Sequence, residues 1–324
     1  MKQHTKLVLG LVTLIALAGC TGSIPGLGAG DPIEYVPHDA EMVVHVDMAV
    51  MEDGDTRTLT DALAAEDPTV DDTDEAVAEF EDETGLDPHQ LRDVVMFATP
   101  IEEAEQFGPQ THTAVILYSD WSEDEFVEAV EEDEMYEFIP TEHNGVTVYE
   151  PDVPEDYFGT PTYVAALGDG EFIVGEEDAV LAAVDVSAGD LNGLDGEMRS
   201  AFEDVRDGYV TFVANVDEEH IPSDQAIQQI DPSAFEDVSV IAGSYGTSSG
   251  ALAVEMMLYT NSESSAQDVA DVTDGGLALL RGTTPDDDLK EQLEGITIEQ
   301  DGTVVTIIYE ADVDDLVELI ESAA

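Results

Sequence analysis

The chain has 324 residues, of which 76 are acidic and only 8 are lysine or arginine, so its formal net charge is −68. This balance argues against nucleic acid and anionic membrane surfaces as partners, because the sequence offers almost nothing to neutralise phosphate groups. Hydrophobic residues make up 43% of the chain and fall into regular strand and helix patterns. That content argues against a disordered acidic protein, which buries too little apolar surface to fold.

The acidity suits a solvent of very high salt concentration. Surface carboxylates repel one another at 0.1 M salt, where the Debye length is about 10 Å, and far less at 1 M, where it is about 3 Å. A bias against lysine codons would leave arginine plentiful, yet arginine occurs only at positions 57, 92, 199, 206 and 281. The composition resembles that of proteins from salt-loving archaea. We therefore expect solvent cations to bind weakly over the whole surface.

The N-terminus carries an export signal. Lys2 and Lys6 precede an apolar run over residues 7–17, and Leu-Ala-Gly-Cys follows, ending at Cys20. A positive start, an apolar stretch and a small-residue cleavage site predict a secretory signal peptide over residues 1–19. The apolar run is shorter than the roughly 20 residues of a membrane-spanning helix.

The end of this signal resembles the lipobox of exported lipoproteins. The resemblance implies cleavage before Cys20 and a lipid on that cysteine; the alternative is a plain signal peptide with a chance cysteine. Cys20 is also the only cysteine, so no internal disulfide can form. Residues 21–30 are uncharged and glycine-rich, and we predict a flexible tether over residues 20–32. Stable anchoring would take two lipid chains or a helping partner, because one chain binds only marginally.

The remaining chain shows a weak internal repeat. Strands are predicted at residues 42–47, 94–98 and 114–119 in the first half, and at 209–217, 238–242 and 253–260 in the second. The third strand ends in Leu-Tyr-Ser or Leu-Tyr-Thr, and a helix follows in both halves. The first of these helices opens with a capping-box pattern at Ser122 and Glu125, preceded by Trp121, which we interpret as a hydrophobic staple.

Hairpins and closing helices complete each half. Asn144-Gly145 and Asp301-Gly302 are strong hairpin signals, because both residue types tolerate the positive φ of a type I′ turn. We match these two hairpins to each other and treat a further one, turned by residues 168–170, as an addition to the first half. Amphipathic helices are predicted at residues 177–186 and 312–322.

The predicted fold class is therefore α+β, with two tandem repeats of mostly antiparallel sheet and amphipathic helices. The first repeat covers residues 33–194 with a helical insert at 52–90, and the second covers residues 195–324. Residues 36–40, Val-Pro-His-Asp-Ala, resemble the start of a family of uncharacterised exported proteins. That resemblance implies no known activity.

One segment matches a catalytic motif. Residues 246–250 fit the G-x-S-x-G pattern, which requires a strand before the serine, a helix after it and a later histidine. Here a second strand is predicted to follow, and the last histidine is His220. We therefore interpret the segment as a small-residue hairpin turn.

Other candidate sites are weak. The acidic runs at residues 71–75, 131–134 and 286–288 lack the spacing of an EF-hand loop, and a chain this acidic carries such runs on any solvated face. The histidines at 38, 45, 89, 112, 143 and 220 show no paired zinc-ligand spacing. Asp47 and Asp217 end matching strands, where they could mark a site or cap turns.

The sequence thus assigns a chemical role to Cys20 alone, as the lipid attachment residue, and no catalytic, cofactor or metal residue. We predict a non-enzymatic, lipid-anchored protein on the extracellular face of the cell membrane. It would bind another envelope protein or serve as an envelope component. The alternatives are a solute-binding lipoprotein of an uptake system, with parallel-stranded lobes around a cleft, and an exported hydrolase with clustered carboxylates.

The composition leads to a first prediction. Dialysis from molar salt to 50 mM should abolish the near-UV circular dichroism, because carboxylate repulsion is then no longer screened. A near-UV spectrum that stays unchanged at 50 mM would argue against adaptation to salt.

Overall fold

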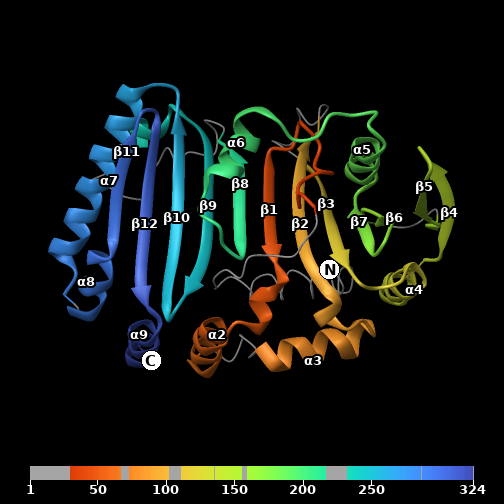
Figure 1. Cartoon of the computed structure of the whole chain (residues 1–324), viewed down its shortest axis with the longest axis horizontal. Coiled ribbons are helices and arrows are strands. Elements are labelled where there is room, and N and C mark those ends of the chain that lie inside the picture. Colours follow the sequence, from red (N-terminus) through yellow and green to blue (C-terminus); the bar gives the residue numbers. More distant parts are fainter. Residues whose placement is uncertain are drawn as a thin grey trace. The chain divides into compact units, whose positions relative to one another are not determined.

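The computed structural model describes residues 30–66, 73–101, 111–134, 136–154, 159–216, 232–285 and 287–323. These residues form two compact units (Figure 1). Unit 1 holds the described residues of 30–52 and 73–195, and unit 2 holds those of 53–66 and 196–323. Each unit combines helices with a sheet whose described strand pairs are all antiparallel, which confirms the predicted α+β class.

Unit 1 is built on a sheet with the strand order β1-β2-β3-β7-β6-β5-β4. Its strands are β1 (Met42–Asp47), β2 (Leu91–Pro100), β3 (Thr111–Ser119), β4 (Phe138–His143), β5 (Val146–Pro151), β6 (Tyr163–Gly168) and β7 (Glu171–Gly175). Its helices are η1 (Met48–Glu52), α3 (Thr73–Thr84), η2 (Pro88–Gln90), α4 (Glu123–Asp133) and α5 (Glu177–Ala188).

Unit 2 is built on a sheet with the strand order β8-β9-β10-β12-β11. Its strands are β8 (Val210–Asn215), β9 (Val238–Ser248), β10 (Ala251–Thr260), β11 (Ile296–Asp301) and β12 (Val304–Asp312). Its helices are α2 (Gly54–Glu66), α6 (Gly196–Asp204), η4 (Pro232–Phe235), α7 (Glu263–Thr283), α8 (Asp287–Glu294) and α9 (Val313–Ala323).

The pairing of the closing hairpins corrects the repeat alignment expected from the sequence. In unit 2 the hairpin β11–β12 closes the sheet because β12 pairs with the third strand, β10. In unit 1 the strand that pairs with the third strand, β3, is β7 of the β6–β7 hairpin. The addition to unit 1 is therefore β4–β5, at the sheet edge. Turn residues specify that a hairpin forms, but not which strand it will join.

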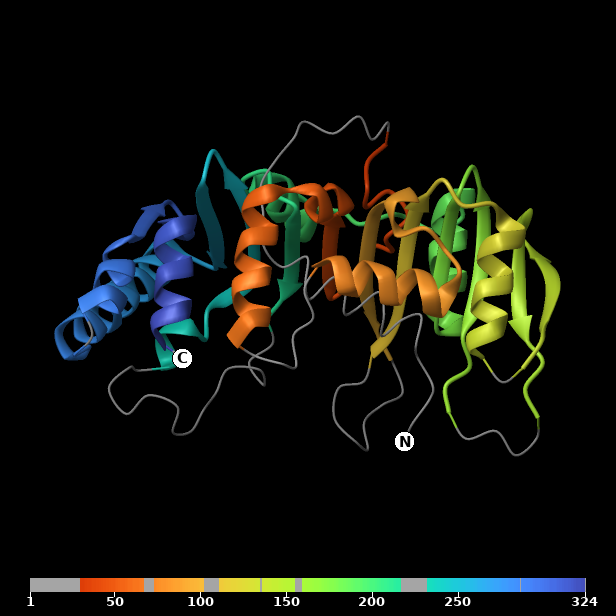
Figure 2. The ribbon, with the colours of Figure 1, turned by 90° about the horizontal axis from the view of Figure 1, so that it is seen from below.

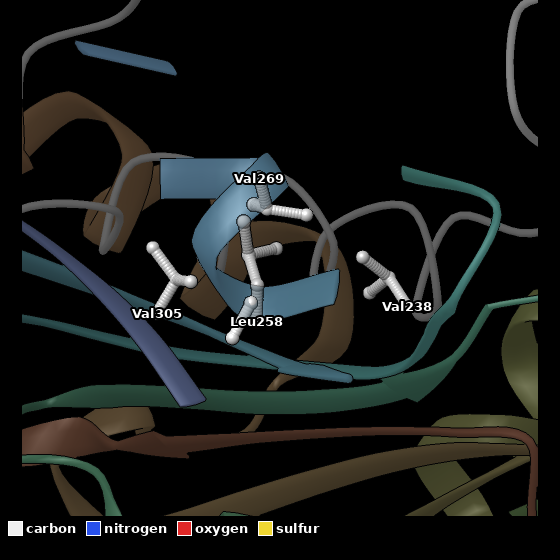
Figure 3. Close-up of a cluster of buried hydrophobic side chains, with 5 residues drawn as sticks. Val238, Leu258, Val269 and Val305 are labelled. Atoms are coloured by element: carbon white, nitrogen blue, oxygen red, sulfur yellow. The ribbon is translucent and has the colours of Figure 1, made fainter. Parts of the chain in front are cut away.

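The Leu-Tyr-Ser and Leu-Tyr-Thr ends of the third strands have the same role in both units. Alternation along a strand sends Leu and Tyr to opposite faces. Leu258 packs with Val269 of α7 in a buried cluster with Val238, Ala266 and Val305 (Figure 3). In unit 1, Leu117 lies opposite Phe172, whose ring stacks on Phe126 of α4 at a centroid distance of 4.2 Å. The leucine thus faces the helix that follows the strand.

The start of α4 confirms two local predictions. The Ser122 side chain accepts a hydrogen bond from the Glu125 amide, and the Glu125 carboxylate accepts one from the Ser122 amide, forming a capping box. Trp121 stacks on Phe126 at 5.8 Å and on Phe80 of α3 at 6.4 Å, so it is the predicted staple. Helices α3 and α4 lie side by side across this stack (Figure 2).

Helix α2 departs from the expected insert at residues 52–90. The part of that segment with α3 and η2 belongs to unit 1, whereas α2 packs in unit 2. Leu59 of α2 is buried against Leu252 of β10 and Val313 of α9. The carboxylate of Asp55 accepts a hydrogen bond of 2.9 Å from the Gly250 amide in the β9–β10 turn. A helix from the first half of the chain therefore completes the core of the second unit.

Leu59→Ala should destabilise unit 2 by about 2–5 kcal/mol, because it removes a buried side chain and leaves a cavity. Hydrogen exchange of the β10 and β12 amides in molar salt measures the effect. The matched control is Leu63→Ala on the same helix, whose side chain is 41% exposed and should change exchange little. Equal effects of the two variants would show that α2 does not support this core.

Candidate functional site

The G-x-S-x-G segment is a hairpin turn, as predicted. Strand β9 runs through Ser248 and β10 starts at Ala251, so no helix follows the serine. Ser249 and Gly250 form the turn with φ values of 57° and 83°. Positive φ at both central residues is the geometry of a type I′ turn, not of a nucleophile elbow. His220 lies outside the described residues.

The acidic runs support local structure where they are described. Asp74 and Glu75 lie in the first turn of α3, and Asp287 and Asp288 in that of α8, where the helix dipole favours negative charge. In the run at 131–134, Glu131 accepts a hydrogen bond of 3.0 Å from the Phe138 amide. Within the described ranges, no group of three or more His, Cys, Asp or Glu side chains could hold a metal ion.

Asp47 behaves as a cap at the end of β1. Its carboxylate accepts a hydrogen bond of 2.9 Å from the Ala49 amide. Burial raises the pKa of Asp47, with a smaller contribution from Asp93, while the Ala49 amide opposes the rise. Its predicted counterpart Asp217 lies outside the described residues, so no site shared by Asp47 and Asp217 can be built. Cys20, the predicted lipid attachment residue, also lies outside the described residues.

Each histidine of the described ranges has a carboxylate close to its ring. His45 lies 2.8 Å from Asp93, His143 lies 2.6 Å from Asp185, and the His112 ring lies between Glu176 at 2.9 Å and Asp178 at 3.0 Å. His38 and His89 each have a carboxylate at 3.9 Å. His38 faces its own sequence neighbour Asp39, whereas the other pairs join different segments of unit 1. Sequence spacing gave no sign of these other pairs, because their partners are brought together by folding.

Arginine side chains hold parts of unit 2 together. The Arg206 guanidinium lies 2.9 Å from the carboxylate of Glu310, and its backbone amide donates to Glu255. Arg281 donates to the backbone oxygens of Leu293 and Ile296, at the end of α8 and the start of β11. The scarce positive charges in these places serve the fold itself.

The first described residues of unit 1 pack against its sheet and against the segment that ends it. Residues 31–40, which we call the strap, follow the predicted tether and pack on the sheet. Ile33 is 1% exposed and Val36 is fully buried. The Val36 oxygen accepts a hydrogen bond of 2.8 Å from the Leu194 amide, and the His38 amide donates to Asn192 at 3.2 Å. The strap therefore joins the segment that ends unit 1.

Two stacked tyrosines clamp the strap onto the sheet. Tyr35 of the strap and Tyr118 of β3 have ring centroids 6.3 Å apart. The Tyr118 hydroxyl donates a hydrogen bond of 2.9 Å to the Pro32 oxygen, and the Tyr35 hydroxyl donates one of 2.9 Å to the Glu171 carboxylate. The sequence analysis did not predict this junction; it noted only that the third strand of each half ends in Leu-Tyr-Ser or Leu-Tyr-Thr, the segment that contains Tyr118.

Carboxylates gather around the tyrosine clamp. Burial raises the pKa of Glu34, and the neighbouring charges of Glu171 and Asp31 raise it further, while a hydrogen bond from Tyr35 lowers it. Burial also raises the pKa of Tyr35 and Tyr118 well above the usual value of 10, and nearby carboxylates add to the rise. The clamp is thus built from hydroxyls that stay protonated in a strongly negative environment.

A tight turn fixes Glu171 beside the strap. Gly170 has a φ of 81°, and a Cβ built there would lie 2.1 Å from the Ser119 oxygen. The Ser119 amide donates a hydrogen bond of 2.9 Å to the Gly170 oxygen. Only glycine fits this approach, which sets Glu171 directly opposite Tyr118 in the β3–β7 register.

Comparison with known proteins found structures with a similar backbone path but no match by sequence. No family model and no curated protein matches the sequence. Crystal form III of TP0453 matches with 11% identity and a TM-score of 0.49, covering 91% of this chain and 99% of that chain. Crystal form IV of TP0453 matches with 9% identity and a TM-score of 0.47, covering 90% of this chain and 96% of that chain.

In the part of the chain that the structure describes, no helix is long and apolar enough to cross a membrane.

The tyrosine clamp predicts alkaline sensitivity. Burial raises the pKa of Tyr118 in the folded state above the unfolded value of about 10, so its contribution to stability is complete below pH 10 and is lost progressively as the pH rises above 10. Tyr118→Phe should cost about 1 kcal/mol below pH 10, because the bond to Pro32 is lost, but should weaken the decline above it. Urea unfolding followed by Trp121 fluorescence in molar salt measures both effects. Parallel declines in the two proteins would contradict this assignment.

Proposed function

We propose that this chain is a lipid-anchored protein of the extracellular face of a cell membrane, and that its folded body is a binding or structural module of the envelope. The lipid would be carried by Cys20 at the end of the Leu-Ala-Gly-Cys sequence. The uncharged, glycine-rich residues that follow would form the tether. The module would work without a resident cofactor or metal.

One observation carries the proposal beyond the signal sequence. The strap begins directly after the predicted tether and is tied into unit 1 by buried side chains, backbone hydrogen bonds and the tyrosine clamp. The first residues of a domain usually fray unless they are held down. A firmly held entry segment suits a protein that is attached to a surface through its N-terminus.

The use of charge supports a protein partner over an anionic ligand. Arg206 and Arg281 contact groups of their own unit, and the histidines of unit 1 face carboxylates. In molar salt, contacts with a partner would rest on apolar and hydrogen-bonding groups, because charge attraction is screened within about 3 Å. Another envelope protein fits these conditions.

The sheet topology supports the envelope role over solute capture. Solute-binding lipoproteins of the type considered above use lobes of parallel strands, whose ligands bind at the strand ends. The described strand pairs of both units are antiparallel. An exported hydrolase would need clustered carboxylates placed for catalysis. Asp47, whose pKa is raised, is engaged as a backbone cap. In the cluster of Glu34, Glu171 and Asp31, the Glu171 carboxylate is engaged by the Tyr35 hydroxyl that holds the strap.

Cys20→Ala should release the protein into the medium, because the lipid would have no attachment point. Cell fractionation in molar salt, with immunodetection of the medium and the membrane, measures the release. Gly28→Ala in the predicted tether is the control and should leave the protein on the membrane. A Cys20→Ala protein that remains membrane-bound would refute lipid anchoring, and crosslinking from intact membranes would then identify the protein that holds it.

A further inference from the structure

The strap combines a few strong contacts with like charges. Ile33 and Val36 are buried, and the Pro32 oxygen is held by Tyr118. Against these contacts stand the carboxylates of Asp31 and Glu34 in the strap and of Glu171 at the start of β7. The charges of Asp31 and Glu171 both disfavour ionisation of Glu34. Glu171 accepts a hydrogen bond from the neutral Tyr35 hydroxyl, and this bond leaves the negative charge of Glu171 in place.

We propose that the strap is a salt-sensitive clasp: when the salt concentration falls, residues 31–40 detach from unit 1 before unit 1 itself unfolds. The reason is that carboxylate repulsion acts against fewer apolar contacts in the strap than in the rest of unit 1. Repulsion at Glu34 grows as the Debye length increases from about 3 Å at 1 M to about 10 Å at 0.1 M. The apolar contacts that oppose it come from a few side chains, whereas the strands of unit 1 bury many apolar residues, including Val43, Phe97 and Ile116.

The position of the strap in the chain allows such local opening. It precedes β1, so it can leave the sheet without disturbing the order β1-β2-β3-β7. Segments with few buried contacts open at a lower free energy than the core. The backbone of the strap is held by the Pro37–Gly193 bridge and by hydrogen bonds with Asn192 and Leu194. These three partner residues lie in the loop after α5.

Opening would change the reach of the protein. Ten released residues extend by at most about 35 Å. If Cys20 carries a lipid, as proposed above, the clasp would set how far the body stands from the membrane according to the salinity of the medium. The clasp itself does not depend on the lipid, and its test uses the protein in solution.

The experiment compares local with global opening in the full chain. Hydrogen exchange of the His38 and Leu194 amides, which donate across the junction to Asn192 and Val36, reports attachment of the strap. Fluorescence of Trp121, the only tryptophan, reports the core of unit 1, in which it is 3% exposed. As salt is lowered, the His38 and Leu194 amides should begin to exchange rapidly while the Trp121 signal is still native.

Charge variants decide whether Glu34 drives the opening. At intermediate salt, Glu34→Gln should slow exchange of the His38 amide by up to about fivefold, the range of an exposed charge interaction. Glu171→Gln should act in the same direction and serves if the first variant folds poorly. Glu79→Gln, on the exposed side of α3, makes the same change in net charge and should have no such effect.

Two results would overturn the proposal. One is loss of strap protection and of the Trp121 signal at the same salt concentration, which would show a single cooperative unfolding. The other is an equal effect of Glu34→Gln and Glu79→Gln, which would show that only net charge matters. Neither result bears on lipid anchoring, which the Cys20→Ala release assay tests separately.

Discussion

Repulsion among carboxylates is the constraint that every part of this structure has to satisfy. With 76 acidic and 8 basic residues, ion pairs cannot balance the charge. The fold uses other means: acids occupy the first turns of helices, accept hydrogen bonds from backbone amides, or face tyrosine hydroxyls. Glu125 and Asp47 accept hydrogen bonds from backbone amides, and Glu171 accepts one from the Tyr35 hydroxyl. Each of these arrangements supplies a neutral donor and leaves the net charge unchanged, so we expect screening by salt to relieve the remaining repulsion.

Tyrosine is the residue that makes this arrangement work in partly buried places. Its ring packs like an apolar group and its hydroxyl donates to carboxylates and carbonyls. Burial next to acidic groups raises the pKa of Tyr149, Tyr163 and Tyr259 to about 12. Tyr118 and Tyr259, the matching tyrosines of the two third strands, are both nearly buried. The same device therefore occurs in both repeats, although it holds the strap only in unit 1.

The two units share an order of elements but differ in the elements added to it. Both have three antiparallel strands, a helix and a hairpin that pairs with the third strand, followed by a closing helix. Unit 1 adds the β4–β5 hairpin at its edge, whereas unit 2 adds α8 and takes α2 from the first half of the chain. Leu59 of α2 fills a core formed with β10 and α9. Unit 2 therefore depends on a segment that precedes most of unit 1 in sequence, which links the integrity of the two units through the chain.

Local features could be predicted from the sequence because their causes are local. The staple at Trp121, the capping box at Ser122 and Glu125, the turn at Ser249-Gly250 and the α+β class all follow from residues close together in the chain. The solvent of high salt inferred from composition and the lipid attachment at Cys20 inferred from residues 17–20 stay predictions. Tertiary structure decided the rest, because it depends on contacts between distant residues. It placed α2 in unit 2, chose β7 over β5 as the partner of β3, and brought Tyr35 onto Tyr118 and Glu171, 83 and 136 positions away, to form the strap junction that no sequence spacing reveals.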